Sequence, residues 1–172
     1  MTPMTLEPQS ERTLYRTHFA QWNEQIGTWE PSWLRARREA AFARFEAVGF
    51  PTTRQEEWRF TNVAPLLRVP FQPAMAPPQR LFLEEWLAPY REWGAHHLIF
   101  VNGHFVGERP ADDRRPTPLA RGIRALLREE PDLVEPYLVR AEADTPNAFA
   151  ALNAAFLTDG AFVRIPRGVV LE

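Results

Sequence analysis

Apolar residues near the N-terminus recur with the period of an α-helix. Between Ser10 and Ile26 they return every three or four positions, which places them on one helical face. A second stretch opens at Glu30-Pro31-Ser32, where Pro31 suits the first helical position, and it stops at Gly49. Two such stretches joined by a short turn predict an antiparallel helical hairpin.

The spacing of the second stretch also predicts which of its side chains are buried. The predicted apolar stripe consists of Leu34, Ala41, Phe45 and Val48. The charged residues Arg35, Arg38 and Glu39 are expected to lie largely elsewhere on the helix. The next residues, 50–62, have no clean period and predict an ordered loop with one or two helical turns.

Further helices are predicted downstream, after an extended, proline-rich connector at 70–78. They cover residues 79–93, 119–128, 132–140 and 147–157. The last of them carries Phe149, Leu152 and Phe156 on one stripe. It follows Thr145-Pro146, which reads as an N-cap and a first-turn proline.

The clearest local signal is a β-hairpin at about 97–107. Asn102-Gly103 separates two apolar-rich runs, and both residues tolerate the positive φ of a type I′ turn. This turn is expected to pair Val101 with His104 and Ile99 with Val106. Residues 108–118 predict a loop, and strands are predicted at 161–165 and 169–171, on either side of a turn at 166–168.

These elements predict a mainly α fold with one β-hairpin, which is an α+β class. We expect an N-terminal helical domain over 1–144, and then, over 145–172, a helix and the first strands of a β-rich domain. A chain that stops inside an edge strand favours an N-terminal piece of a longer protein. Residues 161–171 are therefore expected to be poorly supported, or paired with another copy of the chain.

Composition excludes several kinds of chemistry. The 172 residues include no cysteine and no lysine, and all 20 basic residues are arginine. Disulfides, thiolate nucleophiles, cysteine-ligated metals and catalytic or phosphate-binding lysines are thereby excluded from this chain. A net charge of −2 provides no positive field for nucleic acid. Without an apolar run of bilayer length or a signal sequence, we expect a soluble cytoplasmic protein with no membrane partner.

The histidines and serines do not form a catalytic, cofactor-binding or metal site in this interpretation. His97 and His104 share a face of the hairpin but lie about 13 Å apart, and His96 points to the other face. Half-exposed strand histidines are the expected outcome. Ser10 and Ser32 both lie at helix starts, where capping explains them.

The charged and aromatic groups each have a structural explanation as well as a functional one. The adjacent carboxylates of Glu56-Glu57 rarely converge on one substrate, and a charged loop pinned by a buried Trp58 and by Phe60 is expected instead. The six tryptophans could form a ligand groove, although core packing is the preferred interpretation. Phosphate binding and a solvated helix face are both open for Arg121, Arg124 and Arg128.

Three segments together resemble the SufD branch of the SufB/SufD family, the iron–sulfur cluster assembly proteins of the SUF system. They are Gly49–Thr61 (GFPTTRQEEWRFT), Leu98–Val106 (LIFVNGHFV) and Asn147–Val169 with its NAFAALNAAF and RIPRGV runs. SufB has a different pattern around the Glu-Trp pair, which favours SufD. The matching positions are Pro51, Thr52, Arg54, Glu57, Trp58, Arg59, Thr61, Asn102, Gly103, Phe149, Leu152, Asn153, Phe156, Gly160, Pro166 and Gly168.

The resemblance implies a helical N-terminal domain, a right-handed parallel β-helix core and a C-terminal helical segment. It also implies a SufB-like partner bound through the β-helix and a SufC-like ATPase partner bound through the C-terminal segment, in a cytoplasmic scaffold for cluster assembly. This chain would be the helical domain and the first strands of a truncated β-helix. Its implied role is structural and non-catalytic, with no cofactor in this chain. The alternative hypothesis is a free-standing helical protein-interaction domain with an aromatic groove.

Overall fold

The computed structural model of this chain describes residues 8–26, 29–76, 83–90, 96–110, 119–140 and 147–169. These residues form seven α-helices and two small antiparallel sheets, so the fold is of the predicted α+β class. The chain passes more than once between two units. The helical unit comprises the described parts of Met1–Pro73 and Tyr137–Leu157, and the mixed unit those of Ala74–Pro136 and Thr158–Glu172.

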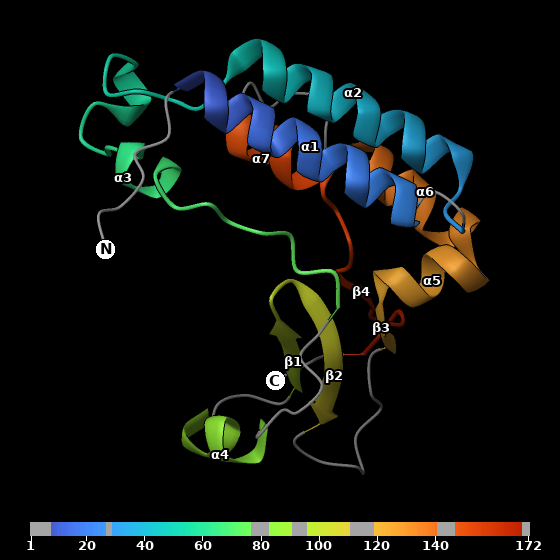
Figure 1. The fold of residues 1–172 in the computed structure, drawn as a ribbon. Helices are drawn as coiled ribbons and strands as arrows, with labels where there is room; N and C mark the ends of the chain where they lie inside the picture. Colours follow the sequence, from blue (N-terminus) through green and yellow to red (C-terminus); the bar gives the residue numbers. More distant parts are fainter. Residues whose placement is uncertain are drawn as a thin grey trace. The chain divides into compact units, whose positions relative to one another are not determined.

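The predicted antiparallel hairpin of helices forms in the helical unit. The main helices of this unit are α1 (Pro8–Ile26), α2 (Ser32–Val48) and α7 (Ala148–Ala155) (Figure 1). The ring centroids of Tyr15 and Phe45 lie 5.7 Å apart, and those of Phe19 and Phe42 lie 4.2 Å apart. Because later residues of α1 meet earlier residues of α2, the two helices run antiparallel.

Helix α2 follows its predicted bounds closely. Pro31 occupies the N-cap position rather than the first helical position, and Gly49 ends the helix with a φ of 69°. The predicted stripe residues Leu34, Ala41 and Phe45 are buried. Val48 is 43% exposed, because the last turn of the helix borders an open cleft.

Helix α7 buries its alanines rather than its large residues. Its fully buried face consists of Ala148, Ala151 and Ala155, which join Ala41 and the phenylalanines of α2 in one core. The predicted stripe of Phe149, Leu152 and Phe156 is only half-buried. Small side chains let two helices approach closely, while larger side chains fill the space beside the contact. The large residues therefore form the margin of this core.

Arg38 of α2 is buried, contrary to the prediction that it lies off the apolar stripe. Only 1% of its surface is exposed. Its guanidinium lies 4.2 Å from the ring centroid of Trp22 and donates a hydrogen bond to the carbonyl of Leu157. It also lies 3.2 Å from the carboxylate of Glu30, which is buried as well. These partners compensate the buried charge, so a position one turn after Leu34 can belong to the core.

Burial determines how this ion pair titrates. Desolvation raises the pKa of the Glu30 carboxyl above 4.5 despite the nearby arginines, and it lowers the pKa of Arg38 to about 10. A carboxyl whose pKa rises on folding binds its proton more tightly in the folded chain. Its contribution to stability is therefore complete below 4.5 and is lost as the pH rises through the folded pKa.

The Glu30→Gln variant should remove this pH dependence. As the pH falls from neutral toward 4.5, the free energy of unfolding of the wild type should increase relative to that of the variant. Urea unfolding of both proteins over a series of pH values measures the difference. A wild-type advantage that shrinks on acidification would show that the Glu30 pKa is lowered by folding.

The mixed unit contains the predicted β-hairpin. Its elements are β1 (His96–Val101), β2 (His104–Pro110), β3 (Leu119–Gly122), β4 (Ala161–Arg164), α4 (Leu83–Leu87) and α5 (Ile123–Glu129). Asn102 and Gly103 have φ values of 50° and 82°, as a type I′ turn requires. A β-bulge shifts the register, so Ile99 pairs with Gly107 and not with Val106. Strand β2 also extends into the segment predicted as a loop.

The pairing of β3 with β4 corrects two further predictions. Leu119 lies opposite Arg164 and Gly122 opposite Ala161. The segment predicted to start a helix at Leu119 is thus a strand, and α5 begins only at Ile123. Strand β4, expected to be poorly supported, has a partner within the chain. A Cβ at Gly122 would lie 3.1 Å from the Phe105 ring, so glycine allows the close approach here.

Asp159 joins three backbone segments of the mixed unit. Its carboxylate accepts hydrogen bonds from the backbone N–H groups of Phe105 at 3.0 Å, Arg124 at 2.9 Å and Gly160 at 2.8 Å. The N–H of Ile123 donates to the carbonyl of Gly160 at 2.8 Å. The first N–H groups of α5 are therefore capped by a segment distant in sequence.

The other described elements are two helices and two 3₁₀ turns. They are α3 (Ala64–Leu67), α6 (Pro131–Arg140) and the 3₁₀ turns at Glu56–Trp58 and Ala88–Tyr90. The turn at Glu56–Trp58 and helix α6 agree with prediction, whereas α4 covers only part of the predicted 79–93 helix, whose ends lie outside the described residues. Thr145 and Pro146 also lie outside them, but the N-cap of α7 is Asn147 and not Thr145 as predicted. The domain boundary at 144 stays a prediction. Of the described helices, none is long and apolar enough to cross a membrane.

Candidate binding cleft

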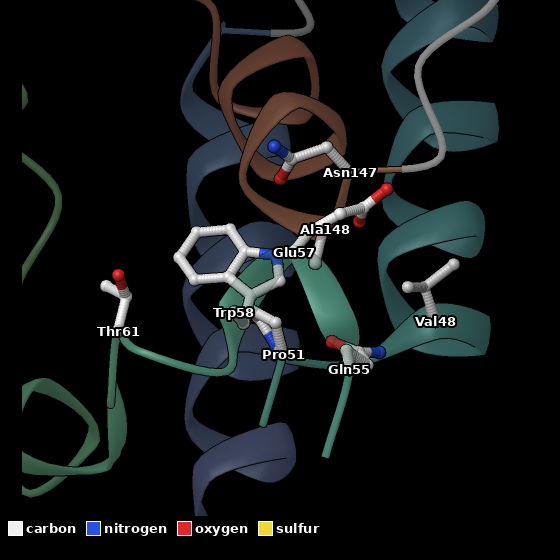
Figure 2. Close-up of a pocket in the computed structure, with 9 residues that line it drawn as sticks. Val48, Pro51, Gln55, Glu57, Trp58, Thr61, Asn147 and Ala148 are labelled. Carbon is white, nitrogen blue, oxygen red and sulfur yellow. The ribbon is translucent and has the colours of Figure 1, made fainter. Parts of the chain in front are cut away.

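A cleft of about 570 Å³ opens in the helical unit beside the loop that follows α2 (Figure 2). Its walls are the end of α2, the loop from Pro51 to Thr61 and the start of α7, and we call it the Trp58 cleft. Two backbone hydrogen bonds shape the loop. The N–H of Gln55 donates to the carbonyl of Thr52, and the N–H of Trp58 to that of Gln55, both at 3.0 Å. The first family-like segment thus folds into one wall of a cleft.

Trp58 supplies the aromatic part of this wall. Its side chain is half-buried, and its ring lies 5.4 Å from that of Phe149 on α7, tilted by 41°. The predicted burial of Trp58 is therefore only partial, because part of the indole borders the open cleft. Phe60 is 87% exposed and carries the Arg59 guanidinium 4.7 Å from its ring centroid, so it does not pin the loop as predicted.

Glu57 determines the charge of the cleft. It is the charged residue among the described residues that line the cleft, and its side chain is exposed. Its neighbour Glu56 lies 3.5 Å from Arg59, whereas Glu57 makes no ion pair or hydrogen bond within the described part of the chain. The two adjacent carboxylates therefore have different surroundings and do not form a paired acid–base site.

Two side-chain amides also border the Trp58 cleft, and both use their oxygens locally. Oδ1 of Asn147 accepts the N–H of Phe149 at 2.8 Å and so caps α7. Oε1 of Gln55 accepts the N–H of Thr52 at 3.3 Å. Asparagine is strongly preferred at helix N-caps, and this preference is the sequence signal that could have identified Asn147 as the N-cap of α7.

Trp58→Ala should lower the free energy of unfolding by about 2 kcal/mol. This is less than for a fully buried tryptophan, because only part of the ring is removed from water. Phe60→Ala in the same loop should change it by less than about 0.5 kcal/mol, since that ring is solvent-exposed. Urea unfolding followed by circular dichroism compares the two variants. Equal effects would contradict the packing of Trp58 on Phe149.

The residues of the family-like segments do not converge on one site. Those lining the Trp58 cleft are Pro51, Glu57, Trp58 and Thr61, while Thr52, Arg54 and Arg59 lie in the same loop outside it. On and after α7, Phe149, Leu152 and Phe156 pack in the helical unit and Asn153 is exposed. In the mixed unit are Asn102, Gly103, Gly160, Pro166 and Gly168, the last with a φ of 84° in the predicted turn.

The hairpin histidines differ from one another in burial. His104 is 1% exposed and its Nε2 lies 2.7 Å from the carbonyl oxygen of Ala74, so the expectation of a half-exposed side chain is wrong there. His97 is half-buried as expected, and the side chain of His96 lies outside the described residues. Within the described ranges, no three histidine or carboxylate side chains lie close enough together to hold a metal ion.

The three arginines considered for phosphate binding border a second, more open cleft of about 440 Å³ in the mixed unit. Arg121 lies on β3, whereas Arg124 and Arg128 lie on α5. The guanidinium of Arg121 bonds Glu129 and, at 2.6 Å, Glu130, and the hydrogen bond to Glu130 raises its pKa. Because two glutamates already neutralise Arg121, the arrangement favours an ion-paired surface over a phosphate site.

Comparison with known proteins identifies the N-terminal region of the SufBD proteins. The model of that family, described as the SufBD protein N-terminal region, matches residues 9–172. The match therefore extends over both units, the Trp58 cleft and the Asp159 contacts. No solved structure matches the chain.

Two curated relatives from Synechocystis sp. are also similar. The chain is 28% identical over 152 residues to "Iron-sulfur cluster assembly SufBD family protein slr0076", covering 83% of this chain and 31% of that protein. It is 51% identical over 47 residues to "Iron-sulfur cluster assembly SufBD family protein slr0074", covering 27% of this chain and 10% of that protein. The chain thus spans less than a third of the length of the curated relatives it matches.

Proposed function

This chain belongs to the SufBD family through its N-terminal region, and from that premise we propose that it is the N-terminal domain of a SufD-like subunit in iron–sulfur cluster assembly. The observation that carries the proposal is the family match over residues 9–172. Both Synechocystis relatives bear names that assign them to iron–sulfur cluster assembly. The Glu-Trp segment that forms the wall of the Trp58 cleft favours SufD over SufB by its resemblance.

The role proposed for this domain is structural and non-catalytic. Glu56 and Glu57 have separate surroundings, and no cofactor is assigned to the chain. The partners we propose for the whole protein are a SufB-like and a SufC-like subunit in the cytoplasm, bound through regions outside these residues. We further propose that β4 leads into a right-handed parallel β-helix. Because β4 already pairs antiparallel with β3, a parallel coil would add to its other edge.

The alternative is a free-standing interaction domain with an aromatic groove. The Trp58 cleft is the feature that favours it, since an indole borders an open pocket there. Trp22, in contrast, is buried against Arg38 and contributes nothing to a groove. This alternative predicts a partner unrelated to cluster assembly.

Affinity purification of the tagged native gene product from its own cells separates the two roles. The scaffold role predicts co-purification of SufB-like and SufC-like subunits at stoichiometric levels. Deletion of the gene should also lower the activity of enzymes that depend on iron–sulfur clusters, such as aconitase, without lowering their protein levels. Unchanged aconitase activity together with an unrelated co-purifying partner would reject the scaffold role and support the alternative.

A further inference from the structure

Two side chains that line the Trp58 cleft are available to a ligand, those of Glu57 and Trp58. The carboxylate of Glu57 is exposed and unpaired within the described residues, and part of the Trp58 indole borders open space. Asn147 also lines the cleft (Figure 2), but the oxygen of its side-chain amide is used to cap α7. Since none of the described lining residues is basic, the electrostatic potential of the cleft follows Glu57.

A carboxylate and a partly exposed indole that line the same cleft are suited to an organic cation. A guanidinium group stacks on an aromatic face and donates hydrogen bonds in its own plane to a carboxylate. The same chain contains this arrangement internally, because Arg38 stacks on Trp22 and pairs with Glu30. We propose that the Trp58 cleft binds the side chain of an arginine presented by a partner protein. Glu57 would be its anionic partner, and the part of the Trp58 indole that borders the cleft would contact the rest of the arginine side chain.

Other ligand classes fit these residues less well. A single carboxylate supplies too few oxygen ligands for a calcium or magnesium ion, which needs six or more in total. A phosphate would find no cation among the described lining residues. A volume of about 570 Å³ also exceeds one side chain and leaves room for the backbone that flanks it.

The surroundings of the cleft favour a protein over a free amino acid. The segment after Thr61 exposes the apolar side chains of Leu66, Val69 and Phe71, each about half accessible to solvent. Single exposed apolar residues are ordinary, but several in one short segment, here the one that follows the cleft residue Thr61 in sequence, are typical of a protein–protein contact. The nearby Arg59 is occupied by Glu56 and by the Phe60 ring, so it does not neutralise Glu57.

This inference goes beyond the proposed role in cluster assembly, since it rests on the cleft alone. The test uses the purified 172-residue chain and a blocked pentapeptide with a central arginine, Gly-Gly-Arg-Gly-Gly. The control peptide carries citrulline, which keeps the shape of arginine but is uncharged. The indole N–H resonance of Trp58, assigned by its loss in Trp58→Phe, reports binding by nuclear magnetic resonance.

The arginine peptide should shift this resonance saturably at millimolar concentration, and the citrulline peptide should bind at least tenfold more weakly. The Glu57→Gln variant should bind the arginine peptide more weakly than the wild type by a similar factor. The matched variant Glu56→Gln should bind the arginine peptide with unchanged affinity. Thermal unfolding of both variants verifies that they are folded. Equal binding of the two peptides, absence of a saturable shift, or equal effects of the two variants would overturn the proposal. The peptide experiment needs no cluster assembly partner. A negative result would therefore reject the arginine-binding proposal without rejecting the proposed role in cluster assembly.

Discussion

Arg38→Met should lower the free energy of unfolding of the helical unit by about 3–5 kcal/mol, the largest effect we expect from one substitution. The change removes the ion-pair partner of Glu30 and leaves its carboxylate buried without compensation. It also removes the donor to the Leu157 carbonyl and the stacking on Trp22. Urea unfolding followed by the helical circular dichroism signal measures the loss.

The double variant Glu30→Met with Arg38→Met should recover most of this loss. Burial moves both pKa values toward the neutral forms, which shows that each charge is costly to keep inside. Replacing a buried ion pair by apolar residues of similar size is often neutral or stabilising by about 1–4 kcal/mol. Arg35→Met, on the same helix but more exposed, serves as the matched control and should cost less than about 1 kcal/mol. A double variant as unstable as the single one would assign the effect to the Leu157 and Trp22 contacts instead.

Asp159→Ala should destabilise the mixed unit by about 3 kcal/mol. Three backbone N–H groups donate to this carboxylate, and bonds to a charged acceptor contribute about 1.5–3 kcal/mol each before water replaces some of them. The loss falls on β2 through Phe105 and on the start of α5 through Arg124. Native-state hydrogen exchange should therefore show faster exchange of both amides in the variant.

Two further variants make the Asp159 prediction specific. Asp159→Asn keeps one acceptor oxygen but turns an NH₂ group toward an N–H, so it should be intermediate in stability. Asp132→Ala removes a carboxylate that is exposed in the first turn of α6, and it should cost at most about 1 kcal/mol. If Asp159→Ala and Asp132→Ala were equally mild, the contacts of Asp159 would contribute nothing beyond ordinary helix capping.

Features governed by neighbouring residues were predictable from sequence. The Asn102-Gly103 turn follows from the positive φ that both residues accept, and α1 and α2 follow from apolar periodicity with Gly49 as a stop. The loop with a short helical turn after Gly49 was predictable because apolar periodicity stops there. Each of these depends on interactions within a few residues.

Features governed by distant partners were not predictable in this way. Arg38 looks like a surface residue until Glu30, Trp22 and the end of α7 surround it. The residues of β3 have a weak strand signal and become a strand because β4 lies beside them.

The Trp58 cleft likewise depends on residues that are distant in sequence. The Gly49–Thr61 segment could be singled out by its resemblance, but the cleft needs the start of α7 as its opposite wall. Whether Trp58 is buried or bordering that cleft depends on Phe149, which lies far along the chain. A lone sequence specifies the residue types of such a site more readily than their exposure.

The alanine face of α7 has a consequence for synthesis on the ribosome. About a hundred residues separate the end of α2 at Val48 from the start of α7 at Ala148, and all of them must be translated before the core of the helical unit can close. At about 5–20 residues per second, the aromatic face of the α1–α2 hairpin stays uncovered for roughly 5–20 seconds in every nascent chain. We therefore expect ribosome-associated chaperones to bind that face until α7 has been translated and covers it.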